Sequence, residues 1–323
     1  MPSVSVVIRC LNEEQHIGRL LSGLVRQSRQ PDEIIVVDSG STDATVSVAE
    51  RYGPTLVHIK PEQFSFGRAL NLGCEAASGD LLVFVSAHVY PLYDSYLALL
   101  TEPFEDPETA LTYGRQVGDH RTKYSESRVM LQWFPEKSIK NQIYPFCNNA
   151  NAAIRRSVWQ DMRYDESLTG LEDLDWARRA QGNGHQIAYV AEAPVAHVHE
   201  ERWKAVHNRY RREAIAYKKI MGDESAVSGP ESVRLALRNA ATDYAQAARD
   251  GVLLSNLAGI PSFRAAQFLG AWQGFRQGDD VSEGLKRRFY YPTQPAGVQI
   301  PPVPGTPIDY SEPGREAGGA PFT

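Results

Sequence analysis

The sequence has 323 residues, of which 42% are hydrophobic, and this is enough for one large α/β domain with an appendage. Its formal net charge is −5 without a strongly basic block, which argues against a nucleic-acid partner. No apolar run reaches the roughly 18–20 residues that span a bilayer, and the first residues lack the features of a signal peptide. Three scattered cysteines without metal-type spacing (Cys10, Cys74 and Cys147) indicate reduced thiols, so we expect a cytoplasmic protein.

Four short apolar runs near the start of the chain predict buried strands, at 4–8, 32–38, 55–59 and 81–85. Helical spacing of apolar residues predicts helices between them, at 17–25, 42–52 and 66–77. This alternation is typical of an α/β fold with a mostly parallel sheet and helices on both faces. Ligands of such sheets bind at the carboxyl ends of the strands, where Arg9, Asp38 and the tripeptide Ser86-Ala87-His88 lie.

The middle of the chain is more mixed. We predict strands at 110–116, 150–155 and 187–190, helices at 123–134, 157–162 and 172–182, and a loop at 136–145. Helices are predicted again at 202–219, 231–250 and 262–276. These patterns divide the chain into an α/β domain at 1–200, a helical extension at 201–290, and a tail at 291–323. The tail is rich in proline and glycine and is expected to be poorly ordered or draped on the surface.

Asp38, in the stretch VVDSGSTDAT, is the first candidate for chemistry. A carboxylate at a strand end can accept a hydrogen bond from the imide N–H of uracil or thymine, and the turn containing Gly40 leaves room for a ring. The alternative is that Asp38 and Asp43 only cap the next helix. The spacing of these residues leaves both interpretations open.

Five stretches follow one another in a specific combination: VSVVIRCLNEE, IIVVDSGSTDAT, GRALNLGCEAASGDLLVFVSAH, NNANAAIRRSVW and GLEDLDWARRAQGNGHQIAYV. Over roughly residues 1–200 the sequence therefore resembles the family-2 glycosyltransferases of the GT-A fold, which is Rossmann-like. In that family the first two strand ends bind the nucleotide of a nucleotide sugar. A DxD motif after the fourth strand holds a divalent metal on the diphosphate, and an acid of a later ED pair is the catalytic base.

The resemblance implies a set of nucleotide-binding residues in this chain: Arg9, Asn12, Glu13, Asp38, Ser39, Gly40, Arg68, Asn71, Ser86 and Ala87. Arg68 and Asn71 share one helical face, three positions apart. By the same resemblance Arg68 touches phosphate, although a solvated or core-capping arginine is the alternative.

The sequence departs from the family at Ser86-Ala87-His88, which stands where the DxD motif is expected. Serine is a poor metal ligand and alanine is none, so His88 is the candidate ligand. His197 and His199 point the same way on an extended segment, and the family often brings a late histidine to the metal. We expect His88 with His199 or His197 to hold Mn²⁺ or Mg²⁺, although imidazole suits Mg²⁺ poorly. The alternative is that His88 donates to the diphosphate without a metal.

Glu172 and Asp173 lie at a helix start, where the macrodipole favours negative charge. By resemblance Asp173 is the base that removes the proton of the acceptor hydroxyl, and Glu172 positions the acceptor. The alternative is simple charge at a helix terminus, for which Asp175 serves equally. Amides can read sugar hydroxyls and an indole can stack on a sugar, so Asn148, Asn149, Asn151 and Trp176 are expected to shape the sugar or acceptor pocket. The alternatives are turn formation by the asparagines and a core position for the tryptophan.

The C-terminal helices carry little chemistry. The basic residues of 202–219 either lie on an anionic membrane surface or form a solvated face packed on the α/β domain. In the helix at 262–276, four residues form an amphipathic face that is a candidate dimer contact: Phe263, Phe268, Leu269 and Trp272.

Together these features predict an inverting glycosyltransferase, acting in the cytoplasm or at the inner face of a membrane. It moves a hexosyl or deoxyhexosyl group from a UDP- or dTDP-linked donor to a glycan or lipid-linked acceptor, in surface polysaccharide synthesis. One alternative is a non-catalytic or metal-independent binder of nucleotide sugars, because the DxD acids are missing. The other is a sugar nucleotidyltransferase, which needs a glycine-rich, lysine-bearing phosphate loop that IRCLNEEQH lacks.

Overall fold

The computed structural model describes residues 1–222, 227–277 and 303–311. Within these ranges eight strands form one sheet, in the order β3-β2-β1-β4-β7-β6-β8-β5. The strands are β1 (Val4–Cys10), β2 (Glu33–Asp38), β3 (Thr55–His58), β4 (Leu81–Ser86), β5 (Val89–Pro91), β6 (Thr109–Val117), β7 (Asn151–Arg155) and β8 (Gln186–His197). Strands β1 to β4 pair in parallel, β6 is parallel to β8, and β5 and β7 are antiparallel to their neighbours. The predicted mostly parallel α/β sheet is confirmed.

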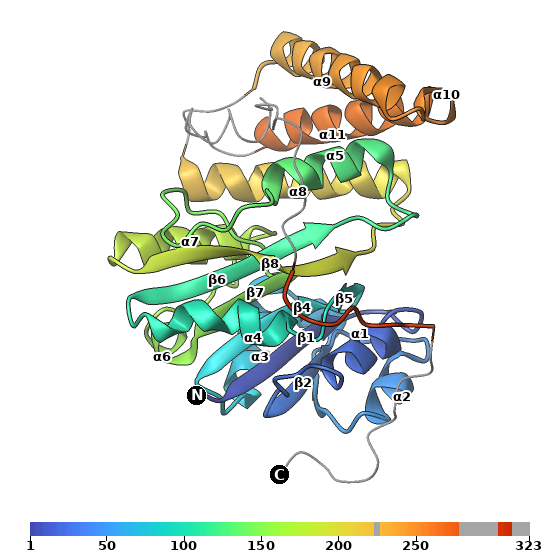
Figure 1. Cartoon of the computed structure of the whole chain (residues 1–323). Helices are drawn as coiled ribbons and strands as arrows, with labels where there is room; N and C mark the ends of the chain where they lie inside the picture. Colours follow the sequence, from blue (N-terminus) through green and yellow to red (C-terminus); the bar gives the residue numbers. More distant parts are fainter. Residues whose placement is uncertain (223–226, 278–302, 312–323) are drawn as a thin grey trace.

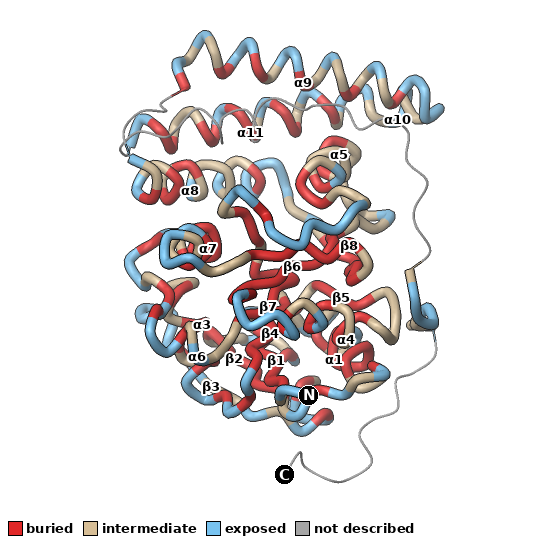
Figure 2. The backbone as a smooth tube through the Cα atoms, turned by 60° about the vertical axis from the view of Figure 1, so that its left-hand side comes forward, coloured by how far each residue is buried: buried red, intermediate tan, exposed pale blue. Residues whose placement is uncertain are grey.

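Helices cover both faces of this sheet (Figure 1). They are α1 (Ile17–Leu24), α2 (Thr45–Glu50), α3 (Phe66–Ala76), α4 (Tyr96–Thr101), α6 (Arg156–Asp161) and α7 (Glu172–Gly182). Successive strand residues face opposite sides, so Val6 packs with Leu20 of α1, whereas Val7 packs with Leu70 of α3. The central strands are accordingly the most buried part of the chain (Figure 2).

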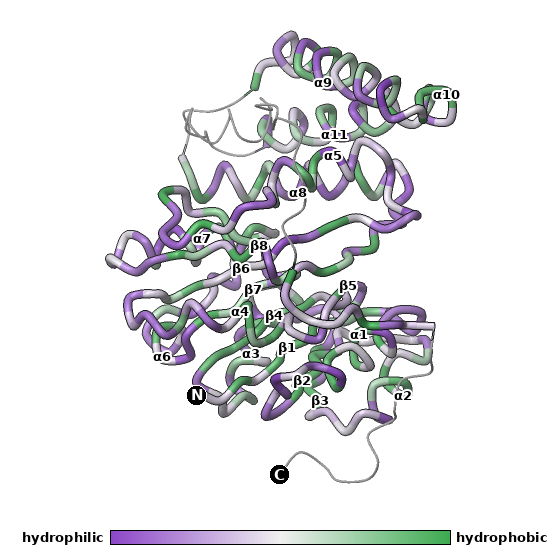
Figure 3. Tube along the Cα trace, in the orientation of Figure 1, coloured by the Kyte–Doolittle hydropathy of each residue, from purple (hydrophilic) through white to green (hydrophobic). Residues whose placement is uncertain are grey.

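A second layer of helices lies beyond one edge of this unit (Figure 1): α5 (Tyr124–Trp133), α8 (Trp203–Met221), α9 (Gly229–Arg249), α10 (Leu253–Asn256) and α11 (Gly259–Phe275). Hydrophilic and hydrophobic segments alternate along α9, as in an amphipathic helix (Figure 3). Helix α11 lies directly on α8, because a Cβ at Gly270 would be 2.3 Å from the carbonyl oxygen of His207. The C-terminal helices therefore pack as part of the fold.

A buried ion pair joins three of these helices. The Arg264 Nε of α11 donates to Asp243 Oδ2 of α9 at 2.8 Å, and the hydroxyl of Ser125 on α5 donates to the same carboxylate at 2.6 Å. Both charged side chains are almost fully buried. Because a buried charge needs its partner, this contact fixes how α5, α9 and α11 sit against one another.

The basic side chains of α8 contact the protein rather than a free surface. The guanidinium of Arg212 lies 4.6 Å from the ring centroid of Phe66, and Lys219 Nζ donates to Ser167 Oγ at 2.8 Å. These contacts favour the packed alternative over the membrane one. Phe263, expected on a dimer face, is buried within the chain itself. Over the described ranges, no helix combines the length and apolar character needed to cross a membrane.

Strand β8 is longer than predicted. The sequence pattern suggested an end at 190, before Pro194, but the strand continues to His197. Its register with β6 shifts between Val190 and Val195, so Pro194 falls within the irregularity, where its missing N–H breaks no ladder hydrogen bond. Because of this extension, His197 lies next to the segment that follows β4.

Part of the predicted tail packs on the edge of the sheet. Ile308 N–H donates to the Leu92 carbonyl at 3.0 Å, just after β5, and the Tyr310 hydroxyl donates to the Pro91 carbonyl at 2.6 Å. Of the two alternatives expected for the tail, residues 303–311 follow the second and are draped on the surface. The rest of the predicted tail lies outside the described residues.

Tyr310→Ala is expected to lower the free energy of unfolding by about 1–2 kcal/mol, because the ring packs against Tyr90 and under the guanidinium of Arg19. Urea unfolding measures the change. Thr306→Ala is the matched control, since Thr306 contributes backbone hydrogen bonds that alanine keeps. Equal stability of the two variants would show that the docked ring adds nothing.

Candidate functional site

Three strands bring polar side chains to one edge of the sheet. Strands β1 and β2 pair with Cys10 beside Asp38, and β1 and β4 pair with Arg9 beside Ser86. Arg9 Nη1 donates to Glu172 Oε1 at 3.1 Å, so this edge is connected to the start of α7. The structure thus brings the predicted nucleotide-binding residues of three strands close to the predicted ED pair.

Asp38 organises the turn that follows β2. Its Oδ2 accepts the N–H of Gly40 and its Oδ1 the N–H of Ser41, both at 3.1 Å. Gly40 has a φ of +94°, which glycine adopts without strain. Burial on its own raises the pKa of Asp38, but the hydrogen bonds from Ser41 and Gly40 outweigh it and bring the pKa below its usual range. Asp38 is therefore an ionised acceptor held rigidly at the sheet edge.

The loops after β1 and β2 are tied together. Asn12, with a φ of +54°, accepts the N–H of Thr42 on its Oδ1 at 2.8 Å and donates its own N–H to Ser41 Oγ at 2.9 Å. The Ser39 N–H donates to the carbonyl of Cys10 at 3.1 Å. Asn12 and Ser39 therefore build the framework of the edge at which the nucleotide is predicted.

Three imidazoles meet next to this edge. His88 follows β4, His197 ends β8, and the β5–β8 pairing puts Val89 opposite His197. The rings of His88 and His197 stack with centroids 5.1 Å apart. One nitrogen from each of His88, His197 and His199 lies within 4.8 Å of the other two. The structure thus assembles all three histidines that the sequence proposed as metal ligands.

Each imidazole is oriented by a side-chain oxygen facing its Nδ1: Glu13 Oε1 for His88 at 2.7 Å, Gln116 Oε1 for His197 at 2.6 Å, and Glu126 Oε1 for His199 at 2.6 Å. When those oxygens accept, Nδ1 carries the proton and Nε2 keeps its lone pair. Such carbonyl- or carboxylate-held imidazoles are typical of metal ligands. Glu13, predicted to bind nucleotide, is engaged by His88 instead.

The Nε2 atoms of His197 and His199 are 2.9 Å apart. Two lone pairs at this distance repel each other unless a proton or another cation lies between them. Burial lowers the pKa of His197 well below its usual range, and the neighbouring His199 and His88 lower it further, so protonation is disfavoured. Neutral imidazoles held in these orientations fit a divalent transition metal.

Asp173 lies in the first turn of α7. The preceding Leu171 has a φ of +55°, an uncommon conformation for leucine that is typical of functional sites. The carboxylate accepts the N–H of Asn149 on Oδ2 at 3.1 Å and that of Leu174 on Oδ1 at 2.8 Å. Burial raises the pKa of Asp173 to about 7, and the adjacent Glu172 carboxylate contributes to the shift. A carboxyl group with this pKa can accept a proton near neutrality.

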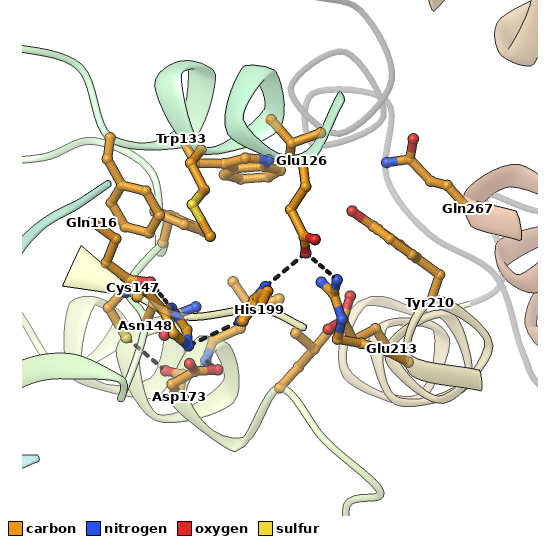
Figure 4. Close-up of a pocket in the computed structure, with 18 residues that line it drawn as sticks. Gln116, Glu126, Trp133, Cys147, Asn148, Asp173, His199, Tyr210, Glu213 and Gln267 are labelled. Carbon is orange, nitrogen blue, oxygen red and sulfur yellow. Dashed lines mark hydrogen bonds and ion pairs between the residues drawn. The ribbon is translucent and has the colours of Figure 1, made fainter. Parts of the chain in front are cut away.

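Asp173, His197 and His199 line one pocket (Figure 4). The pocket encloses about 130 Å³ that water can occupy, and it opens to solvent. The predicted base and two of the predicted metal ligands therefore share one cavity instead of facing separate surfaces.

Two residues predicted to shape the sugar pocket are buried in the framework. Trp176 is 0% exposed, and its Nε1 donates to the Met162 carbonyl at 2.6 Å. Asn151 is also 0% exposed, and its Nδ2 donates to the carbonyls of Arg115 and Ala193 at 3.1 Å each. Both predictions are wrong, because the sequence pattern does not reveal whether a polar or aromatic side chain is consumed by core contacts.

The predicted phosphate-side helix α3 is also engaged by the protein. Asn71 is buried; its Nδ2 donates to the Tyr164 carbonyl at 3.0 Å and its Oδ1 accepts from Trp159 Nε1 at 3.1 Å. Arg68 forms an ion pair with Glu166 at 3.3 Å. The prediction that Asn71 binds nucleotide is therefore wrong, and the guanidinium of Arg68 is already paired.

Several site residues gave no signal in the sequence. Gln116 and Glu126 orient the histidines but precede them by more than 70 positions, so no local spacing connects them. Asn148, in contrast, was among the asparagines that the sequence proposed, and it lines the pocket, whereas its neighbour Asn149 is buried and holds Asp173 through its backbone. The sequence signal that could have found Glu126 is an acid on the apolar side of the amphipathic helix α5, because such a residue needs a buried partner like His199.

Part of the α/β unit matches a known protein family. Residues 5–163 match the model of Glycosyl transferase family 2. Over these residues the chain is similar to family 2 glycosyltransferases. This similarity agrees with the predicted resemblance.

The chain is also similar to the O-antigen chain rhamnosyltransferase WbaN of Salmonella anatum, with 28% identity over 225 residues that cover 65% of this chain and 70% of WbaN. It is also similar to the glycosyltransferase AglE of Haloferax volcanii, with 24% identity over 209 residues, covering 61% and 67%. Among solved structures, the mannosyltransferase PcManGT of Pyrobaculum calidifontis, in complex with GDP-Man and Mn²⁺, superposes with a TM-score of 0.59 at 21% identity, covering 85% and 86% of the two chains. This likeness shows the GT-A-like fold.

Proposed function

We propose that the protein is an inverting glycosyltransferase of surface polysaccharide synthesis, which moves a sugar from a UDP- or dTDP-linked donor to a hydroxyl of a glycan or lipid-linked acceptor. The carrying observation is the single pocket that holds the Asp173 carboxylate together with the imidazoles of His197 and His199. The rhamnosyltransferase relatives support a deoxyhexose as the transferred group.

The proposed step uses Asp173 as the base. The acceptor oxygen attacks the anomeric carbon from the face opposite the diphosphate, and its proton passes to the Asp173 carboxylate. The bond between the anomeric carbon and the diphosphate oxygen breaks, and its electron pair leaves with the nucleoside diphosphate, so the configuration inverts. Glu172, held by Arg9, positions the acceptor side of this exchange.

The histidine cluster includes His88, which stands at the position where the resemblance implies a DxD motif. His88, His197 and His199 would hold the divalent ion, and three imidazoles favour Mn²⁺ over Mg²⁺. When bound, such an ion neutralises charge on the diphosphate leaving group. Asp38, ionised at the neighbouring strand end, is proposed to accept from the imide N–H of a pyrimidine base.

The rate is expected to rise with pH through neutrality. Since Asp173 acts as a base and its pKa is about 7, kcat should increase about tenfold per pH unit below about pH 6 and become constant above about pH 8. Glu172 raises this pKa, Arg9 lowers it, and His197 and His199 face the same pocket. A profile measured at saturating donor that stays flat from about pH 5.5 to 8.5 would contradict the assignment.

A nucleotide screen by thermal shift, with and without Mn²⁺, tests the proposed function. UDP or dTDP is expected to raise the melting temperature, and more so with Mn²⁺, because ligands that bind only the folded state stabilise it. GDP serves as the purine comparator. If no nucleotide raises the melting temperature under either condition, the proposed donor site is wrong.

A further inference from the structure

The pocket beside Asp173 is closed by helices that lie outside the family-matched residues 5–163. Tyr210 and Glu213 come from α8 and Gln267 from α11, whereas Asn148 and Asp173 come from the α/β unit. Figure 4 shows Tyr210 and Gln267 on the side away from Cys147 and Trp133. The C-terminal helices therefore supply one wall of the cavity in which the base lies.

The polar groups on that wall are free to meet a ligand. Within the described ranges, neither the Glu213 carboxylate nor the Tyr210 hydroxyl has a hydrogen-bond partner, although both line the pocket. Gln267 is held in place, because its Oε1 accepts from Arg264 Nη1 at 2.8 Å and Arg264 is fixed by Asp243. Its amide N–H₂ group is left to donate.

The charge of this wall indicates a neutral ligand. Arg209 is the one arginine or lysine among the described pocket residues, and its guanidinium is already bound by Glu126 and Glu201. The other acidic groups without an arginine or lysine partner are the carboxyls of Glu213 and Asp173, and burial raises the pKa of both. Among the described pocket residues, no arginine or lysine is therefore left to bind a phosphate, whereas the hydroxyls of a neutral ring can hydrogen-bond to these carboxyls.

The opposite wall is aromatic. Trp133 and Phe146 stack with centroids 4.5 Å apart, and Phe134 lies next to them in the pocket. A large apolar surface facing a few convergent hydroxyl, carboxyl and amide groups is the usual design of a site for a ring that has an apolar face and polar edges. A hexose ring has this character.

We propose that α8 and α11 bind a neutral sugar ring of the acceptor next to Asp173, with Tyr210 and Glu213 as specificity-determining residues that read its hydroxyls. This inference rests on the proposed function, because the ring is taken to present its hydroxyl to Asp173. It assigns acceptor recognition to α8 and α11, which lie beyond the family-matched part of the chain.

Saturation-transfer NMR on the full chain tests the proposal, with Mn²⁺ and excess UDP present to fill the donor site. The probes are the methyl glycosides of glucose, galactose, mannose and rhamnose, with glucose 6-phosphate as the anionic comparator. At least one methyl glycoside is expected to bind. Tyr210→Phe removes a hydroxyl, and Glu213→Gln replaces an acceptor oxygen with an amide donor, both with little change of shape. Each should weaken that binding about tenfold or more.

Glu50→Gln, the same chemical change at an exposed position on α2, is the matched control and should bind as the parent does. The proposal is overturned if no methyl glycoside binds, if both pocket variants bind as tightly as the parent, or if glucose 6-phosphate binds more tightly than every neutral sugar. Failure of the proposed function is separate, because it would appear as a missing thermal shift with UDP and dTDP.

Discussion

Asp173→Asn is expected to lower kcat by about 10²- to 10⁴-fold, because an amide cannot take the proton that a carboxylate base removes from the acceptor hydroxyl. The amide oxygen can still accept the N–H of Asn149, so the local fold should persist. Thermal shift with UDP or dTDP is expected to match the parent, since the donor edge formed by Asp38 is untouched. Steady-state kinetics with saturating donor measures the loss.

Asp175→Asn is the matched control for this prediction. Asp175 lies on the same helix, two positions on, but its carboxylate is occupied by Arg179 Nε at 2.7 Å. The structure favours Asp173 as the base over Asp175, because it alone of the two lines the pocket. An unchanged kcat in Asp173→Asn, or an equal loss in both variants, would remove Asp173 from this role.

His199→Ala is expected to weaken Mn²⁺ binding by at least about 100-fold, because it removes one of three converging imidazoles. Electron paramagnetic resonance of free Mn²⁺ measures this directly, without any assay of activity. Mg²⁺ is expected to compete poorly with Mn²⁺ in the parent, since imidazole ligands suit Mg²⁺ poorly.

Two further variants sharpen the metal test. Glu13→Gln should weaken Mn²⁺ binding by about 10- to 100-fold, as its carboxylate orients His88 without being a ligand itself. His120→Ala is the matched control, because the His120 side chain is 83% exposed and does not belong to the histidine cluster. If the parent binds Mn²⁺ no better than His199→Ala does, the histidine cluster is not a metal site.

Much of the α/β unit could be predicted from local pattern. Strand β1 and helix α7 occur where β-branched runs and helical spacing indicated, because these signals depend on residues within one or two turns. The HVH spacing of His197 and His199 likewise fixed their common side on an extended segment.

The burial of individual side chains and the length of β8 could not be predicted from local pattern. Asn71 and Trp176 look like site residues by type, yet their polar atoms are consumed by Tyr164 and Met162 in the interior. Strand β8 runs through Pro194 because its pairing with β6 shifts register there. This pairing joins segments far apart in the chain, so it cannot be predicted from the residues around the proline.

The sequence by itself determined which chemical groups this protein has available: an acid pair at a helix start, three histidines after two strands, and an acid on the turn after β2. Only the tertiary structure decided that Asp173 and the imidazoles share a cavity, that Glu13 and Glu126 orient those imidazoles, and that α8 and α11 close the cavity. The physical reason is the separation along the chain of the residues that interact. Strand and helix periodicity is set by near neighbours in the chain, whereas contacts between residues more than 70 positions apart depend on how whole elements pack.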